Sequence, residues 1–238
     1  MIFRVVFWLM LPVSVLQGLW LRKKATRLPG APGTRQGTTG EGDALQLLAI
    51  GDSIIDGVGT NHIEQSLPVQ FAQQLAKRTQ RCVHWRVEGE TGNDIVDVIK
   101  LIESLSRTVQ ADLVLISVGV NDVTGLTSTR SWRKKLLQLL DRLEQRWPGI
   151  HVMFAGLPPM SLFPLPPQPL RFTLGLRAAT LDRIAAGIIA GYSHATHVPT
   201  DINPQAHDFC EDGFHPSAES CTLWARELAI IESRRESA

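Results

Sequence analysis

The sequence contains few cysteines and no excess of charge of either sign. Only Cys82, Cys210 and Cys221 are present, an odd number with wide spacing. This spacing is not that of a disulfide framework and lacks the paired ligands of a zinc site. We therefore expect reduced thiols, with one bridge between Cys210 and Cys221 left open. The 24 basic and 23 acidic residues give a net charge of +1, so we expect no nucleic-acid partner.

Aromatic residues are also scarce, at 6% of the chain, and Tyr192 is the sole tyrosine. No sugar-stacking surface is therefore evident in the sequence. Six histidines show no metal-ligand spacing, and we expect neither a metal nor a cofactor. They are His62, His84, His151, His194, His197 and His207. Apolar residues make up 44% of the 238, which is enough to build the core of one domain.

One uncharged apolar run, residues 5–21, lies near the start and is followed by Arg22, Lys23 and Lys24. Its length is at the lower edge of what spans a bilayer, and no small-residue cleavage site follows it. Three interpretations of residues 1–24 stay open: a membrane anchor or interfacial helix, an export signal, or a helix packed on the domain near its substrate entrance. The first predicts a membrane-associated or cell-envelope protein, with the cytoplasm as the alternative location.

Residues 25–43 are rich in glycine, proline and threonine, which predicts a linker or a strap over the surface. From residue 44 to 238, short apolar runs alternate with helical patterns about five times. This alternation predicts a five-stranded parallel sheet with helices on both faces. The strands are expected near 44–50, 82–89, 112–119, 150–156 and 195–199, and the last helix at 216–232, with Pro216 as its first residue.

Polar, glycine-bearing segments follow three of these strands and precede the last helix. They are residues 51–57, 88–93, 119–122 and 212–216. Ligands of parallel sheets bind beyond the carboxyl ends of the strands, so we expect these segments to converge on one site. Asp52 and Asp122 are expected to bond loop backbone, whereas Asp56 and Glu90 are expected on a solvated rim.

The residue types in these segments are those of nucleophilic catalysis. A serine hydroxyl such as that of Ser53 needs a base, and the imidazole of His215 is suited to that task. Asp212 lies three residues before His215, from where its carboxylate can orient the ring. The N–H groups of Ser53 and Gly89 and the side-chain amide of Asn121 are candidate donors to an oxyanion.

The segments GDSI (51–54), the glycine of EGET (Gly89), GVND (119–122) and DGFH (212–215) resemble, in order, the four sequence blocks of the SGNH (GDSL) hydrolase family. The resemblance implies a flavodoxin-like three-layer α/β/α sandwich. It also implies a Ser53, Asp212 and His215 triad, with Ser53, Gly89 and Asn121 in the oxyanion hole. Ile54 departs from the commoner leucine, a conservative change. The nucleophile is not in a G-x-S-x-G elbow, which argues against an ordinary α/β-hydrolase.

The leader, the linker and the proline-rich stretch 156–171 resemble a bacterial subgroup linked to long-chain N-acyl amino acid metabolism and lysophospholipase-like enzymes. We expect residues 157–170 to line an acyl pocket together with the N-terminal apolar segment, or else to tuck their apolar side chains into the core. The predicted activity is hydrolysis of a small-molecule acyl ester or thioester, with a lipid-like chain. The alternatives are a carbohydrate O-acetylesterase and a non-catalytic membrane-tethered scaffold.

Overall fold

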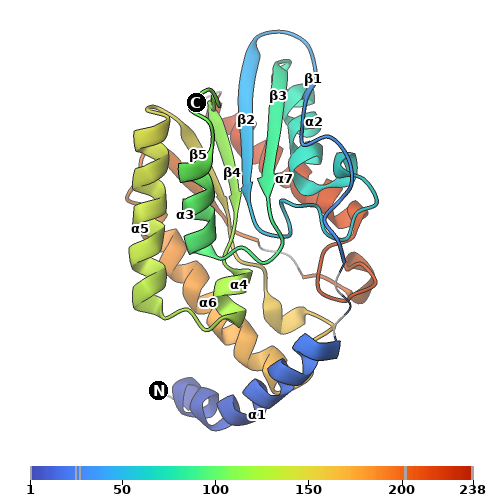
Figure 1. Ribbon diagram of the computed structural model, residues 1–238, viewed down its shortest axis with the longest axis vertical. Coiled ribbons are helices and arrows are strands. Elements are labelled where there is room, and N and C mark those ends of the chain that lie inside the picture. Colours follow the sequence, from blue (N-terminus) through green and yellow to red (C-terminus); the bar gives the residue numbers. More distant parts are fainter. Residues whose placement is uncertain (1, 25, 27, 201–202, 237–238) are drawn as a thin grey trace.

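The computed structural model describes residues 2–24, 26, 28–200 and 203–236. A twisted sheet lies between two layers of helices (Figure 1). The described strands are β1 (Gln36–Thr39), β2 (Ala44–Gly51), β3 (Cys82–Gly89), β4 (Leu113–Ser117), β5 (His151–Ala155) and β6 (Ala195–Val198). The longer helices are α1 (Ile2–Lys24), α2 (Leu67–Thr79), α3 (Ile95–Ser104), α5 (Thr129–Arg146), α6 (Leu170–Ile189) and α7 (Ala218–Glu236).

The sheet order is β1-β3-β2-β4-β5-β6. Strands β2 to β6 are parallel and follow the flavodoxin-like order, so the predicted three-layer α/β/α fold is confirmed. The prediction of five parallel strands is wrong in one respect, because β1 adds a sixth, antiparallel strand beside β3. Its sequence, QGTT, has no apolar run, and it falls inside the range predicted as a linker.

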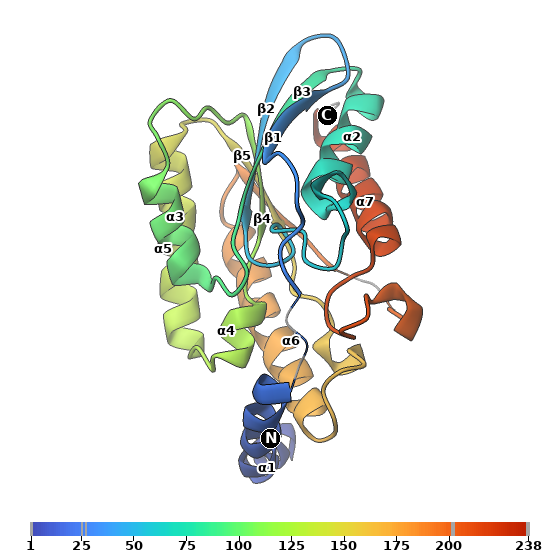
Figure 2. The ribbon, with the colours of Figure 1, turned by 45° about the vertical axis from the view of Figure 1, so that its right-hand side comes forward.

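The two faces of the sheet are buried by different helices. Alternate residues of β2 illustrate the division, because Leu48 and Ile50 pack towards α3, α5 and α6 whereas Leu47 and Ala49 pack towards α2 and α7. Figure 2 shows the same division of the helices between the two faces. A strand that is buried on both faces consists mostly of apolar residues, so the central strands can be predicted from the sequence.

Two boundaries near the site differ from those predicted. A short helix, α4 (Val120–Thr124), follows β4 directly. The last helix begins at Ala218, so Pro216 precedes it and instead forms a bridge with Phe209. The proline-rich stretch is irregular as expected, apart from a 3₁₀ turn at Met160–Leu162.

The apolar N-terminal segment forms α1, which lies against α6. Gln17 fixes this contact: its Nε2 donates to the carbonyl of Gln168 at 2.8 Å, and its Oε1 accepts from the N–H of Leu170 at 3.0 Å. Across the part of the chain that is described, no helix combines the length and the apolar character needed to span a bilayer.

Candidate active site

Ser53 lies in the turn that follows β2. The next strand in the chain, β3, lies on one side of β2, and the strand after that, β4, lies on the other side, so the order of the strands reverses at β2. Loops diverge at such a switch point and leave a crevice. The turn is fixed by backbone bonds, since the N–H of Asp52 donates to Ser117 at 3.1 Å and the N–H of Val58 donates to Ser53 at 3.0 Å. Ser53 is 8% exposed, so its hydroxyl is held in place but can still be reached.

A chain of hydrogen bonds joins Ser53 to His215 and Asp212. The Oγ of Ser53 is 2.9 Å from Nε2 of His215, and Nδ1 of the same ring is 2.6 Å from Oδ2 of Asp212. The hydroxyl and the ring come from positions 162 residues apart. The structure therefore brings together the candidate nucleophile, base and orienting carboxylate in the geometry that acyl transfer needs.

The carboxylate of Asp212 is held by more than the ring of His215. Its Oδ1 accepts from the backbone N–H groups of Phe214 at 2.8 Å and His215 at 2.9 Å, and from the thiol of Cys210 at 3.0 Å. Burial alone would raise the pKa of Asp212, but these hydrogen bonds and the one from His215 outweigh it and hold the pKa far below its usual value. Asp212 is therefore an anion at neutral pH.

The candidate oxyanion donors lie on loops that are bonded to one another. Asn121, the second residue of α4, donates one amide hydrogen to the carbonyl of Asn93 at 2.9 Å, which leaves its second hydrogen for a ligand. Asn93 in turn donates to the carbonyl of Gly51, at the end of β2, at 3.2 Å. Asn93 is thus bonded on one side to Gly51, two residues before Ser53, and on the other side to Asn121.

Two glycines of this region have different surroundings. Gly89 ends β3, and a Cβ at that position would collide with the backbone nitrogen of Asp56, so glycine has a packing reason to be there. Gly92 has a φ of 98° and open space beside its Cα. Gly92 lies within the predicted segment 88–93, and its N–H, which was not among the predicted donors, is a further candidate donor on the same loop.

Asp52 and Asp122 bond loop backbone as expected. Oδ1 of Asp52 accepts from the N–H of Ile54 at 3.1 Å, and Oδ2 of Asp122 accepts from the N–H of Ile95 at 3.0 Å. Both residues are 1% exposed. Burial, as the largest cause, raises the pKa of Asp52 to about 7 and that of Asp122 to about 6.

We expect Asp52→Asn to change how stability depends on pH. The folded-state pKa of Asp52 is raised, so its contribution to stability is fully present below the unfolded value near 4 and is lost as pH rises through about 7. The amide has no such titration and can still accept from Ile54. Relative to wild type, the variant should therefore gain on the order of a few kcal/mol in free energy of unfolding between pH 4 and pH 8. Urea unfolding at both pH values measures the difference, and a constant difference would contradict the assignment.

Asp56 does not lie on a solvated rim, which corrects the expectation from sequence; it is 9% exposed. Its Oδ1 accepts from Nη2 of Arg35 at 2.7 Å, and its Oδ2 accepts from the hydroxyl of Thr91 at 2.7 Å. Arg35 comes from the predicted linker, and Thr91 precedes Gly92. The carboxylate of Asp56 thus ties the segment that contains Arg35 to the loop that contains Thr91. Glu90 is exposed, as expected.

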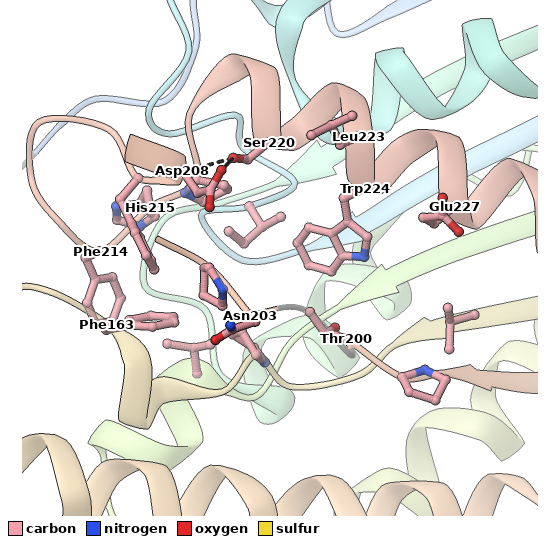
Figure 3. Close-up of a pocket in the computed structure, with 18 of the residues that line it drawn as sticks. Phe163, Thr200, Asn203, Asp208, Phe214, His215, Ser220, Leu223, Trp224 and Glu227 are labelled. Atoms are coloured by element: carbon pink, nitrogen blue, oxygen red, sulfur yellow. Dashed lines mark hydrogen bonds between the residues drawn. The ribbon is translucent and has the colours of Figure 1, made fainter. Parts of the chain in front are cut away.

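A cavity of about 490 Å³ opens beside Ser53 and His215. Figure 3 shows Trp224 projecting from α7 towards Thr200 and Asn203, with Phe163 and Phe214 nearer to His215. The apolar lining residues are Ile54, Val120, Pro158, Phe163, Val198, Pro199, Pro204, Phe209, Phe214, Pro216, Leu223, Trp224 and Ile231. An apolar groove therefore leads away from the nucleophile along α7.

The expected pocket lining is confirmed in part. Pro158 and Phe163 of the proline-rich stretch line the cavity, whereas Met160 of the same stretch is buried in the core. No residue of α1 whose side chain is described contributes to the lining, so the expectation is wrong for that part of the N-terminal segment. Leu223, Trp224 and Ile231 of α7 line the cavity instead, and none of them was predicted from the sequence.

The three cysteines are free thiols in the structure, so the Cys210–Cys221 bridge left open by the sequence is absent. Burial, as the largest cause, raises the pKa of Cys210 to about 11 and that of Cys221 to about 12. Cys210 therefore stays protonated and can act as a donor to Asp212.

Comparisons with known proteins show the family and the fold of the chain. Residues 49–221 match the profile of the GDSL-like Lipase/Acylhydrolase family. A search of curated sequences gave no match. Among solved structures, a Clostridium thermocellum family 3 carbohydrate esterase is similar with a TM-score of 0.66 and 17% identity, over 82% of this chain and 100% of that one.

Two further solved structures have the same fold. The lipase Lip_vut3 from a goat rumen metagenome has a TM-score of 0.63 and 14% identity, over 79% of this chain and 97% of that one. Axe2, an acetylxylan esterase from Geobacillus stearothermophilus, has a TM-score of 0.56 and 19% identity, over 82% and 94%. At these identities the likeness establishes the fold, and lipases and carbohydrate esterases both occur among the neighbours.

Proposed function

Because the chain belongs to the GDSL-like lipase/acylhydrolase family, a family of carboxylic ester hydrolases, we propose that Ser53, His215 and Asp212 are its catalytic triad. The observation that carries the proposal is the unbroken set of hydrogen bonds from the Ser53 hydroxyl through His215 to Asp212. The roles follow from chemistry. Nε2 of His215 can accept the hydroxyl proton, and the Asp212 anion stabilises the imidazolium that forms.

In the proposed reaction, the Oγ of Ser53 attacks the acyl carbonyl while His215 takes the proton. His215 then protonates the leaving group, and an acyl-enzyme forms. A water deprotonated by His215 attacks the acyl carbon, the bond to Oγ breaks, and Ser53 takes the proton back from His215 as the acid leaves. The N–H groups of Ser53 and Gly89 and the amide of Asn121 are the proposed donors to the oxyanion. The N–H of Gly92 is the alternative to that of Gly89, because open space lies beside Gly92 whereas Gly89 packs against Asp56.

We propose that the substrate is an acyl ester or thioester with a lipid-like chain. The support is the groove that begins at Ser53 and has an apolar lining for most of its length. Each buried methylene contributes about 0.8 kcal/mol, so a decanoyl chain in this groove gains far more than an acetyl group. Assignment to the N-acyl amino acid or lysophospholipase-like subgroup stays a prediction.

The test is the rate on p-nitrophenyl acetate and p-nitrophenyl decanoate. We expect wild-type kcat/KM to favour decanoate by about tenfold or more. Trp224→Ala removes the indole that projects over the groove, and it should lower the decanoate rate about tenfold while changing the acetate rate little. Leu137→Ala, on α5 and outside the groove, is the control and should leave both rates unchanged.

The outcome separates the alternatives. A preference for acetate that Trp224→Ala does not alter would favour a carbohydrate O-acetylesterase. Two of the solved neighbours are a carbohydrate esterase and an acetylxylan esterase. No hydrolysis of either ester, nor of a broader panel, would favour the non-catalytic scaffold.

A further inference from the structure

Among the residues of helix α1 whose side chains are described, the usual surface pattern is largely reversed. The polar Ser14 and Gln17 face the domain together with Leu21, whereas the large apolar side chains on the other side face solvent. Ser14 is 3% exposed, and both ends of the Gln17 amide are bonded to the segment at Gln168 and Leu170. On the outer side, Leu16 is 68% exposed and Leu19 is 56% exposed. A surface helix in water normally has the opposite arrangement.

The exposed apolar side chains of α1 form one continuous strip. Val13, Leu16 and Trp20 are spaced three and four residues apart, as are neighbours on one side of a helix, and Val15 and Leu19 continue the strip. Each of the five is at least 40% exposed. A contiguous apolar strip of this kind marks a surface that another apolar body covers.

The strip lies at the same end of the molecule as the cavity. Figures 1 and 2 both place α1 and the loop that leads into α6 at the end towards which the parallel strands point. Two further exposed apolar side chains are close to the site in the chain: Leu162 precedes the lining residue Phe163, and Leu223 itself lines the cavity.

The charge of α1 indicates what covers the strip. The helix has no acidic residue, and Lys23 and Lys24 are exposed at its end. The Nζ of Lys24 lies 5.1 Å from the ring centroid of Trp20, which is 53% exposed. Tryptophan beside lysine is typical of the headgroup region of a membrane, and basic residues there are attracted to anionic lipid. Two copies of α1 face to face would bring like charges together.

We propose that α1 is an interfacial helix that docks on a bilayer surface carrying anionic headgroups. Its Ser14 and Gln17 side stays on the domain, and its Leu16, Leu19 and Trp20 side enters the boundary between headgroups and acyl chains. Docking in this orientation turns the cavity end of the molecule towards the lipid. The consequence that substrate enters from the membrane rests on the proposed function, whereas the docking itself does not.

The test is flotation of the full-length protein with phosphatidylcholine vesicles, prepared with and without phosphatidylglycerol. We expect binding that is stronger with phosphatidylglycerol. The triple variant Leu16→Ser, Leu19→Ser, Trp20→Ser should lose about tenfold or more in partitioning, and Lys23→Gln with Lys24→Gln should lose about tenfold on the anionic vesicles alone. Leu137→Ser replaces an exposed leucine on α5 and is the matched control, with binding unchanged.

Turnover of a water-soluble ester and size-exclusion chromatography accompany each variant. Equal turnover shows that the variants are folded and that the site is intact. Wild type that floats with neither vesicle, or a triple variant that floats as wild type does, would overturn the proposal. So would a dimer that the triple variant abolishes, in the absence of vesicle binding. Flotation without any turnover would leave the docking in place and remove the proposed esterase function.

Discussion

Ser53→Ala is expected to lower kcat/KM for any ester the protein hydrolyses by about 10⁴- to 10⁶-fold. The hydroxyl lies 2.9 Å from Nε2 of His215, and alanine leaves the base with no hydroxyl of Ser53 to deprotonate. Oxyanion donors and the groove remain, so a small residual rate above that of water is expected. Initial rates on a p-nitrophenyl ester measure the change.

The control for this prediction is the stability of the same variant. Ser53 contributes one side-chain hydrogen bond to His215, so the free energy of unfolding should change by no more than about 1–2 kcal/mol. A variant that stays folded and keeps a tenth or more of the wild-type rate would show that another residue supplies the nucleophile.

Asp212→Asn is expected to lower kcat by about 10⁴-fold. The asparagine oxygen can still accept from the N–H groups of Phe214 and His215, so the loop keeps its shape. Its amide nitrogen, however, faces Nδ1 of His215 at the position where Oδ2 lies at 2.6 Å. The ring must then present a lone pair at Nδ1 and its proton at Nε2, the tautomer that cannot take the proton of Ser53. Single-turnover measurements separate this loss from any change in binding.

The matched variant for Asp212→Asn is Cys210→Ala. The thiol donates to Oδ1 of Asp212 at 3.0 Å and has no contact with the reacting atoms, so its loss should cost about tenfold or less. If Asp212→Asn were as mild as Cys210→Ala, the carboxylate would not be setting the tautomer of His215.

The parallel core of this fold is predictable from sequence because its strands are buried on both faces. Strands Leu113–Ser117 and His151–Ala155 have no exposed position, and each is an apolar run apart from one terminal residue, Ser117 or His151. Strand β1 could not be found in this way. Its residues are alternately exposed and half-buried, and what defines it is pairing with β3, far along the chain.

The candidate triad is predictable for a related reason. Parallel strands bring their carboxyl ends to one edge, so polar residues that follow them must meet, and Ser53 and His215 do. The contacts that surround the candidate triad could not be predicted in this way. Nothing local indicates that Arg35 reaches Asp56, or that Trp224 lines the groove, because these contacts depend on how the strap and α7 pack against the sheet.

The most direct test of the account is the reaction of the wild-type protein with a fluorophosphonate, followed by mass spectrometry of the intact chain and its peptides. The account predicts a single adduct on the peptide that contains Ser53, formed by attack of its activated oxygen on phosphorus, and none in Ser53→Ala. An unreactive wild-type protein, or the same adduct in Ser53→Ala, would contradict it.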